Sequence, residues 1–468
     1  MNKLRILRVT LAGVLASAQA LVVMATVLAQ SNTARVETSF STIVVKTSLA
    51  PTSAVARYAD PQTGLTVDQA VAYALEHNGE LLAARKEIDA AKAMVKQARL
   101  RANPKLDIEG ARQIPPGKDN SMMATAMLPL ELGGRRSTRI EVAEREVEVR
   151  EQEVANRERL LAGEIRMKFG EALAQAMKLS FTDESVEANQ QSFNLIAAKV
   201  VEGATPPLEQ NMALVELNRL KSMRESVAGK IEVSLFELQN LIGMQPEQPL
   251  RLKGDFDHLI DQLPPVAEAT ERALRDRPDI QAFRANESLA TARIEQASAE
   301  GRLDASLTAG YERMNSSFPV FGVNEQGQLQ PVQDVFHFLK FGISLDLPIR
   351  NKNQGAIEAA VADSAAARSR RLFVELTVRR EVASAYVRYD RAIRAEQIFR
   401  LGARDPARAN LDVVRQTYEL GSKNLLDFIG EQRRFIELEN DFIDAQLAAY
   451  NARVEIGRAT ASPEFMKR

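Results

Sequence analysis

The sequence predicts a mainly α-helical chain that is duplicated internally and carries one β-hairpin in each half. The first observation behind this fold class is a proline-free helical pattern of nearly seventy residues at about 133–201. Apolar residues recur within it at every seventh position: Ile140, Val147, Val154 and Leu161. This spacing is typical of a coiled-coil seam on an otherwise charged helix. The second observation is that the order of elements returns in the second half, including a long helical pattern at about 354–420.

Composition argues against several classes of function. The 468 residues carry a formal net charge of −1, so no basic surface indicates a nucleic-acid partner. The absence of cysteine removes disulfides, thiol nucleophiles and cysteine metal sites. The three histidines, His77, His258 and His337, lie far apart without metal-ligand spacing. Because the sequence also shows no phosphate-binding loop or nucleophile motif, we expect neither an enzyme nor a bound cofactor or metal.

Residues 1–29 have the pattern of an export signal. Basic residues precede an apolar run at 9–28, and small residues allow cleavage after Ala29. The alternative is an uncleaved membrane anchor, since the run approaches the length that spans a bilayer. Residues 30–64 show no helical periodicity, and we expect them to form an extended segment.

The first half, 65–263, is predicted to contain short helices, a β-hairpin and a helical hairpin. The expected elements are a helix at Val67–His77, a helix at about 80–102, a β-hairpin at about 103–132 and a helical hairpin at about 133–243. Thr66 is a suitable cap for the first helix. Alternating polar and apolar residues on both sides of a Pro-Pro-Gly turn predict the strands. The helical hairpin reverses where Gly203 ends one helix and prolines start the next.

The second half, 264–460, repeats this order. The expected elements are helices at about 266–276 and 278–301, a β-hairpin at about 303–349 and a helical hairpin at about 352–457, followed by a tail at 461–468. Residues at about 314–334 are rich in Asn, Gln, Ser and Gly, and we expect an exposed loop there between the two strands. Pro406 lies inside the second long helix and predicts a kink or break near it.

The predicted strands are too few to close a β-barrel within one chain. Each half supplies two strands, whereas small barrels need about eight. Closure therefore requires several copies of the chain, and the same association would bury the apolar stripes of the helices. A homo-oligomer with one barrel of strands and a second barrel of helices meets both requirements. The alternation by itself is equally compatible with a soluble hairpin.

Four phrases lie within the duplicated order of elements along about residues 65–460, and the second is the partner of the first. They are Leu128-Pro129-Leu130-Glu131-Leu132-Gly133-Gly134-Arg135-Arg136, Leu347-Pro348-Ile349-Arg350-Asn351-Lys352-Asn353, Ala273-Leu274 with Arg277-Pro278-Asp279-Ile280, and Tyr418-Glu419-Leu420-Gly421-Ser422. Together they resemble the TolC-type outer membrane factor family, also called outer membrane efflux proteins. The first phrase is most similar to the CzcC-like cobalt–zinc–cadmium efflux branch of that family.

The resemblance implies a fold, a location and partners. It implies a homotrimer in which four strands of each chain form a twelve-stranded barrel in the outer membrane. The long coiled-coil helices would continue as an α-helical barrel across the periplasm. The implied partners are outer membrane lipid, a periplasmic adaptor (membrane fusion protein) and an inner-membrane transporter of the resistance-nodulation-division class.

The resemblance also implies pore and gate residues at the periplasmic end. Aligning the two helix reversals puts Glu209, Tyr418, Lys423 and Asp427 where relatives carry gate-network and pore-constriction residues. Three copies of Asp427 around an axis would form an anionic ring that favours cations, and Glu209 with Lys423 would latch neighbouring helices. Where relatives often place a second acidic ring, this chain has Gly430. The alternative is that these are ordinary charges on a solvated helical face.

The two reversals are also candidate contact sites for the adaptor. The residues concerned are Gly203, Ala204, Thr205, Pro206, Gly421, Ser422 and Asn424. Gly and Pro at these positions also serve the reversal of the chain, and the two roles are compatible.

The expected function is that of an outer membrane channel, the exit duct of a tripartite efflux pump. It would passively export substrate, heavy-metal cations if the CzcC-like resemblance extends to cargo, from the periplasm or the pump to the exterior. One alternative is the outlet of a type I secretion or drug efflux system. Another, from a different class, is a periplasmic coiled-coil structural or adaptor protein, which absence from the outer membrane would favour.

Overall fold

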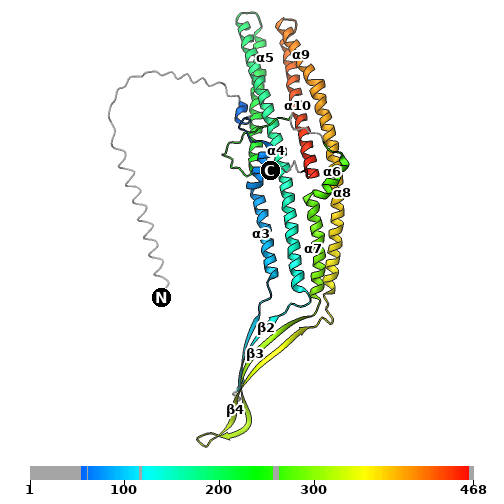
Figure 1. Cartoon of the computed structure of the whole chain (residues 1–468). Helices are drawn as coiled ribbons and strands as arrows, with labels where there is room; N and C mark the ends of the chain where they lie inside the picture. The colour runs from blue at the N-terminus through cyan, green and yellow to red at the C-terminus, as the bar shows by residue number, and fades with distance from the viewer. Residues whose placement is uncertain (1–53, 61, 115–118, 257–262, 463–468) are drawn as a thin grey trace, which may run out of the picture. The chain divides into compact units, whose positions relative to one another are not determined.

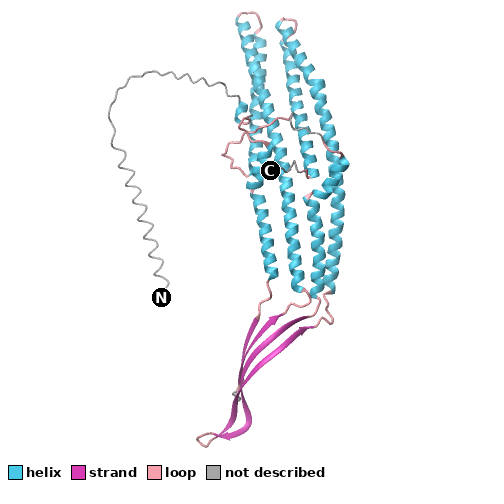
Figure 2. Ribbon diagram, viewed as in Figure 1, coloured by secondary structure: helices cyan, strands magenta, loops and turns pink. Residues whose placement is uncertain are grey.

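The computed structural model describes residues 54–60, 62–114, 119–256 and 263–462 (Figure 1). The expected signal sequence at 1–29, its cleavage after Ala29, most of the extended segment and the end of the tail lie outside these residues. In the described part, long helices run alongside one another, and the strands continue from one end of them (Figure 2). None of the described helices combines the length and the apolar composition needed to cross a membrane.

One order of elements occurs twice. The first series is α2 (Val67–His77), α3 (Gly79–Arg99), β1 (Lys105–Arg112), β2 (Asn120–Pro129), α4 (Arg135–Val201) and α5 (Pro207–Ile242). The second series is α6 (Val266–Asp276), α7 (Pro278–Glu300), β3 (Asp304–Val323), β4 (Leu329–Asp346), α8 (Gln354–Ile398), η2 (Phe399–Ala403), α9 (Arg404–Glu419) and α10 (Leu425–Thr460). The internal duplication predicted from the sequence is therefore confirmed.

Local sequence explains where the first helices begin and end. The Thr66 hydroxyl accepts a hydrogen bond from the Gln69 N–H at 3.3 Å, and the Gln69 side chain accepts one from the Thr66 N–H, which forms a capping box at α2. Asn78 caps α3 with its side chain alone, its Oδ1 accepting from the Leu81 N–H at 2.9 Å. Gly243 ends α5 with a φ of 79°, a conformation that glycine adopts without strain.

The prediction of an exposed loop at about 314–334 is wrong. β3 and β4 both run through this region and remain paired as far as Val323 and Leu329. The turn between them is confined to 324–328, where Gly327 has a φ of 75°. The polar composition suggested a loop, but strand pairing satisfies most of the backbone hydrogen bonds here, with one irregularity in register between Ser317 and Phe321.

Part of the expected extended segment is structured. η1 (Ala54–Arg57) is a short 3₁₀ helix, and Ala59 and Leu65 each form a parallel bridge with Leu252. In the irregular connection after α5, Leu252 and Phe256 are buried in the core. Isolated apolar residues make these contacts, so no repeating pattern marks them in the sequence.

The second long helical pattern is interrupted near Pro406, as the sequence predicts. α8 ends at Ile398 and is followed by the π-helical turn η2 before α9 begins. A continuous α-helix would press the proline ring against the carbonyl of Gly402, and the π turn relieves this conflict. The single rod of the first half therefore corresponds to two consecutive helices in the second half.

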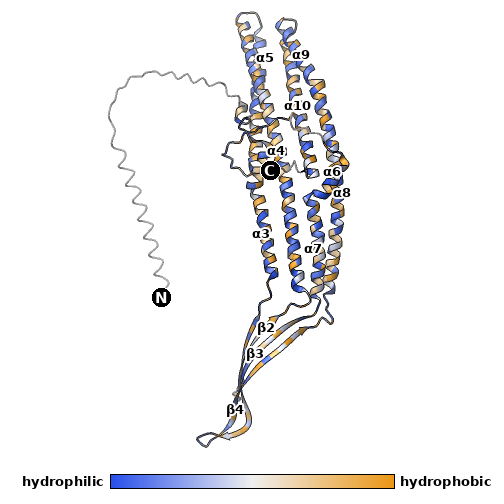
Figure 3. Cartoon of the chain, viewed as in Figure 1, coloured by the Kyte–Doolittle hydropathy of each residue, from blue (hydrophilic) through white to orange (hydrophobic). Residues whose placement is uncertain are grey.

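The strands form one antiparallel sheet in the order β1-β2-β3-β4, with hydrophobic and hydrophilic residues interspersed along the strands (Figure 3). The strand register sorts these residues into an apolar face and a polar face. One row of paired residues across the sheet is Leu106, Ala126, Ala309 and Phe341. The next row, on the opposite face, is Asp107, Thr125, Gly310 and Lys340. Along the central strands β2 and β3, residues of the apolar face are mostly the exposed ones, and those of the polar face are half-buried. The sheet is therefore concave on its polar side.

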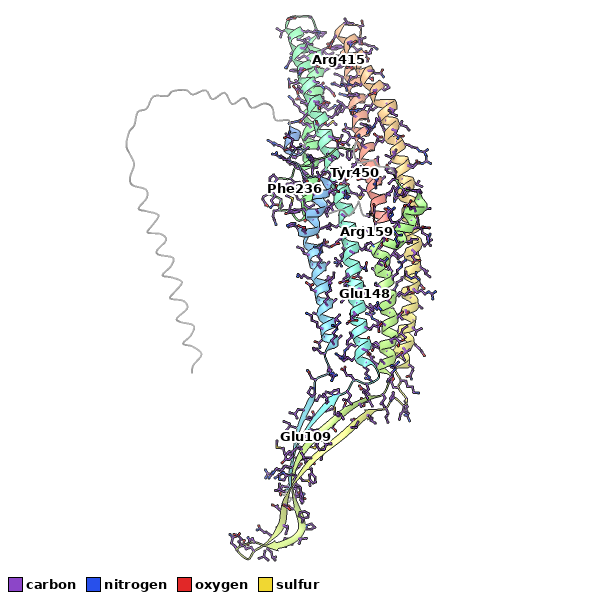
Figure 4. All side chains as sticks on the ribbon, in the orientation of Figure 1. Glu109, Glu148, Arg159, Phe236, Arg415 and Tyr450 are labelled. Atoms are coloured by element: carbon purple, nitrogen blue, oxygen red, sulfur yellow. The ribbon has the colours of Figure 1, made fainter. Side chains whose placement is uncertain are left out.

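The main core lies where α2, α4 and α5 meet α10. Its fully buried residues include Val71, Ile165, Leu179, Ile231 and Leu238. Tyr450, labelled in Figure 4, reaches from α10 into this core and packs on α4, where Gly170 leaves room for its ring. Of the predicted heptad residues in α4, only Val154 is buried, and Ile140, Val147 and Leu161 are half-buried, so one chain covers this seam only in part.

The Arg277-Pro278-Asp279 segment connects helices of the second half through hydrogen bonds and ion pairs. Arg277 is buried and donates to Asp279 Oδ1 at 3.0 Å, to Glu381 Oε2 at 2.7 Å and to the carbonyl of Ala459 at 3.1 Å. Burial raises the pKa of the Asp279 carboxyl, but the hydrogen bonds and charge of Arg277 outweigh burial and hold it below its usual range. A phrase that the sequence marks as a family signature thus links α7, α8 and α10.

We predict that Gly170→Ala destabilises the protein. A methyl group at this position would overlap the Tyr450 ring, and overpacking of this kind costs about 1–3 kcal/mol. Gly229 in α5 is the matched control, because nothing lies within 4 Å of the added methyl group. Gly229→Ala should leave stability unchanged or raise it by up to about 1 kcal/mol. Thermal unfolding in detergent, followed by circular dichroism, measures both, and equal behaviour of the two variants would contradict the prediction.

Candidate functional site at the helical tips

Each helical hairpin reverses through a glycine with positive φ. At the first tip Gly203 has a φ of 76°, and its N–H donates to the carbonyl of Val200 at 3.0 Å. At the second tip Gly421 has a φ of 78°, and its N–H donates to the carbonyl of Tyr418 at 2.9 Å. The two tips lie at the same end of the helices, opposite the strands (Figure 1). The expected reversals are therefore present, and they have equivalent geometry.

The helices that leave the two tips begin differently. Pro206 and Pro207 open α5, where a missing N–H costs no helical hydrogen bond. Asn424 opens α10, and its Oδ1 accepts from the Asp427 N–H at 2.9 Å. Glu209 and Asp427 are each the third residue of their helix, so they occupy equivalent positions in the two halves.

Tyr418 and Glu209 connect the two hairpins. The Tyr418 hydroxyl donates to Glu209 Oε2 at 3.2 Å, and its ring stacks on Phe428 with centroids 5.8 Å apart. Burial and the neighbouring Glu209 carboxylate raise the pKa of Tyr418 to about 12. A free tyrosine titrates near 10, so this contact stabilises the folded tip below pH 10 and loses that contribution as the pH rises to about 12.

Lys423 and Asp427 form a local pair on the second tip. Lys423 Nζ lies 3.9 Å from an Asp427 carboxylate oxygen, and both side chains are about half exposed. A pair of this kind contributes little to stability because solvent screens it. Within one chain Glu209 is bonded to Tyr418 rather than to Lys423, so a latch between Glu209 and Lys423 would have to form between copies of the chain.

A small apolar cluster lies beneath the tips. Its buried members are Ile196, Ala213, Leu425, Phe428 and Ile429, which come from α4, α5 and α10. The partly buried Tyr418 packs against this cluster, with its ring stacked on that of Phe428. The cluster holds the first hairpin against the second close to the reversals.

Glu216 forms a buried ionic link between the hairpins that our sequence interpretation missed. Its side chain is 1% exposed and accepts from Arg433 at 2.5 Å and from Arg219 at 2.9 Å. Burial raises the pKa of this carboxyl, but the two arginines outweigh burial and hold it below the usual range. A signal was present, because Glu216 falls between Ala213 and Leu220 on the apolar stripe of α5.

The tips also expose apolar side chains at equivalent positions. Leu208 and Leu426 are each the second residue of the helix that leaves a tip, and they are 67% and 64% exposed. Val201 and Leu420, which precede the reversals, are more exposed still. Each tip therefore exposes two apolar side chains, one before the reversal and one after it. In the part of the chain that the structure describes, no group of three or more His, Asp or Glu side chains is placed to hold a metal ion.

Comparison with known proteins identifies a family and relatives that this chain resembles. The family described as "Outer membrane efflux protein" matches residues 70–244 and 269–462. The cobalt-zinc-cadmium resistance protein CzcC of Cupriavidus metallidurans is 22% identical over 396 residues, which cover 84% of this chain and 89% of that protein.

Solved structures share the fold. CusC superimposes with a TM-score of 0.70 at 18% identity, covering 84% of this chain and 91% of that chain. A membrane protein from Pseudomonas aeruginosa gives a TM-score of 0.69 at 23% identity, covering 84% and 90%. The open state of the MtrE outer membrane channel from Neisseria gonorrhoeae gives 0.67 at 18% identity, covering 86% and 90%.

We predict that Tyr418→Phe loosens the tips. The variant keeps the ring stacking and loses only the hydrogen bond to Glu209, and a bond to a charged group is worth about 1.5–3 kcal/mol. Amide hydrogen exchange in 203–209 and 418–428 should therefore become about tenfold faster or more. Tyr73→Phe in α2, far from the tips in sequence, is the control and should leave these amides unchanged. Identical exchange in the wild type and Tyr418→Phe would show that the bond does not hold the tips.

Proposed function

The chain belongs to the outer membrane efflux protein family, and on that premise we propose that it is the exit duct through which a tripartite pump exports heavy-metal cations. Proteins of this family are passive channels rather than enzymes, and they lie in the outer membrane and extend into the periplasm. The helices therefore belong on the periplasmic side and the strands in the membrane.

The two-faced sheet is the observation that carries this proposal. Apolar residues cover one face, and β1 and β4 each leave an edge unpaired within the chain. Lipid offers no hydrogen-bonding partners, so strands in a membrane must close into a barrel. Three copies would place β1 of one chain against β4 of the next and close a twelve-stranded barrel, with the apolar face toward lipid and the polar face toward water.

The helical tips fit the periplasmic end of such a duct. Their exposed leucines, Leu208 and Leu426, offer an apolar surface to a periplasmic adaptor, together with the backbone of the reversals. In a trimer, Asp427 and its equivalent Glu209 would surround the axis near this end and favour cations over anions. The adaptor would in turn connect the duct to an inner-membrane transporter of the resistance-nodulation-division class.

The relative named for cobalt, zinc and cadmium resistance supports metal cations as the cargo. Its 22% identity leaves drug efflux or type I secretion as the competing roles of the same duct. Growth of a deletion strain, with and without the restored gene, separates these roles. We expect the deletion to sensitise cells to cobalt, zinc or cadmium and not to a panel of antibiotics, and the gene to restore growth. Sensitivity to antibiotics alone would assign the duct to organic cargo.

We predict that Asp427→Asn lowers the cation preference of the channel. Removing the charge in three copies weakens the anionic ring without changing the size of the side chain. Single-channel reversal potentials in a salt gradient measure the ratio of cation to anion permeability, which should fall toward one. Asp412→Asn is the matched control, because Asp412 lies in α9 and pairs with Arg415 at 3.3 Å. An unchanged ratio in Asp427→Asn would remove Asp427 from the pore.

A further inference from the structure

Methionines on β2 and β3, and two phenylalanines on β4, interrupt the polar face of the sheet. The strand register places Met123, Met127 and Met314 on the same face as Asp107 and Thr125. All three methionines are half-buried, as expected on the concave side. Apolar residues belong on the lipid face of a membrane strand, and the wet face is normally polar. Three thioethers on the wet face therefore call for an explanation beyond membrane insertion.

Carboxylates lie beside these thioethers. Met123 is paired directly with Glu109 on β1 and with Glu312 on β3, so the three side chains form one row across the face. Directly paired residues have Cβ atoms about 4.5–5.5 Å apart. Met314 lies two residues beyond Glu312 on β3 and thus on the same face, at a diagonal distance of roughly 7–8 Å from Met123. Two thioethers and two carboxylates consequently share one patch, which Phe338 and Phe336, paired with Glu312 and Met314, border on β4.

Side chains in this patch reach across the sheet. Gly310 on β3 carries no side chain, and above it Lys340 Nζ from β4 lies 3.8 Å from the Met123 sulfur on β2. Lys340 also forms an ion pair with Glu312. The flexible Met123 side chain thus already contacts a cation held by Glu312. With Glu109 included, the patch carries a net negative charge and attracts further cations.

We propose that Met123, Met314 and Glu312 form a weak binding site for soft monovalent metal cations on the wall of the duct, with Glu109 beside it. Thioether sulfur selects copper(I) over the harder divalent ions, and a carboxylate supplies the compensating charge. The bound ion would replace the Lys340 ammonium group on Glu312. Met127, four residues from Met123 on the same face, provides the next thioether along the strand. The inference rests on the proposed function, because this face lines a lumen only if the strands close into a channel.

Silver(I) is the appropriate probe, because it shares the soft, closed-shell character of copper(I) and resists oxidation in air. Tag-free trimer in detergent is titrated with silver nitrate by calorimetry in chloride-free buffer. We expect the wild type to bind silver, and Met123→Leu/Met314→Leu to bind it at least tenfold more weakly. Met122→Leu is the matched control, because Met122 is adjacent in the chain, lies on the opposite face and is 58% exposed. Lys340→Gln should strengthen binding, since it frees Glu312.

Two further measurements distinguish failure of the proposed metal site from failure of the proposed duct. Zinc nitrate should bind the wild type and the double leucine variant equally, because zinc does not favour thioethers. Equal silver affinity in the wild type and the double variant would overturn the site. Single-channel conductance of the wild type in potassium nitrate tests the duct independently. Conductance without methionine-dependent silver binding would overturn the metal site alone, whereas the absence of conductance would overturn the duct and this inference with it.

Discussion

The whole structure depends on the unpaired edges of a small sheet with one apolar face. Every backbone N–H and C=O group in lipid needs a partner, and β1 and β4 cannot supply partners to each other within one chain. Association is therefore required for membrane insertion rather than added to a finished protomer. The helices also require association, because the heptad positions of α4 are buried only in part within one chain. Association of several chains therefore pairs the edge strands and covers the helical seam at the same time.

Ionic contacts fix how the helices lie against one another. Buried Arg277 connects α7, α8 and α10 in the middle of the chain, and buried Glu216 connects α5 to α10 near the tips. A buried charge is costly when its partner is lost, so these links favour one register of the helices over shifted alternatives. Rods with repeating apolar stripes otherwise tolerate sliding by one heptad. The charges thus supply a specificity that the apolar seam lacks.

The parts that sequence reasoning predicts well are those with a local cause. Heptad spacing locates the rods, and Gly203 and Gly421 locate the reversals, because a positive φ favours glycine. The errors come from contacts made at a distance. Strand pairing, rather than composition, converts 314–334 from an apparent loop into β3 and β4. Likewise the bond from Tyr418 to Glu209 joins residues 209 positions apart, so no local pattern reveals it.

The duplication has kept some features equal and let others diverge, and the differences gather in the second hairpin. Glu209 and Asp427 keep equivalent positions, as do Leu208 and Leu426. Among the residues that the structure describes, however, only the second series contains a π turn, η2, and it is followed by Pro406. A helix whose hydrogen-bond ladder is already interrupted bends at lower cost than the continuous α4. Tyr418 lies in α9, beyond this interruption. The second hairpin, which bends more easily, therefore also carries the tyrosine whose hydrogen bond to Glu209 joins the two tips.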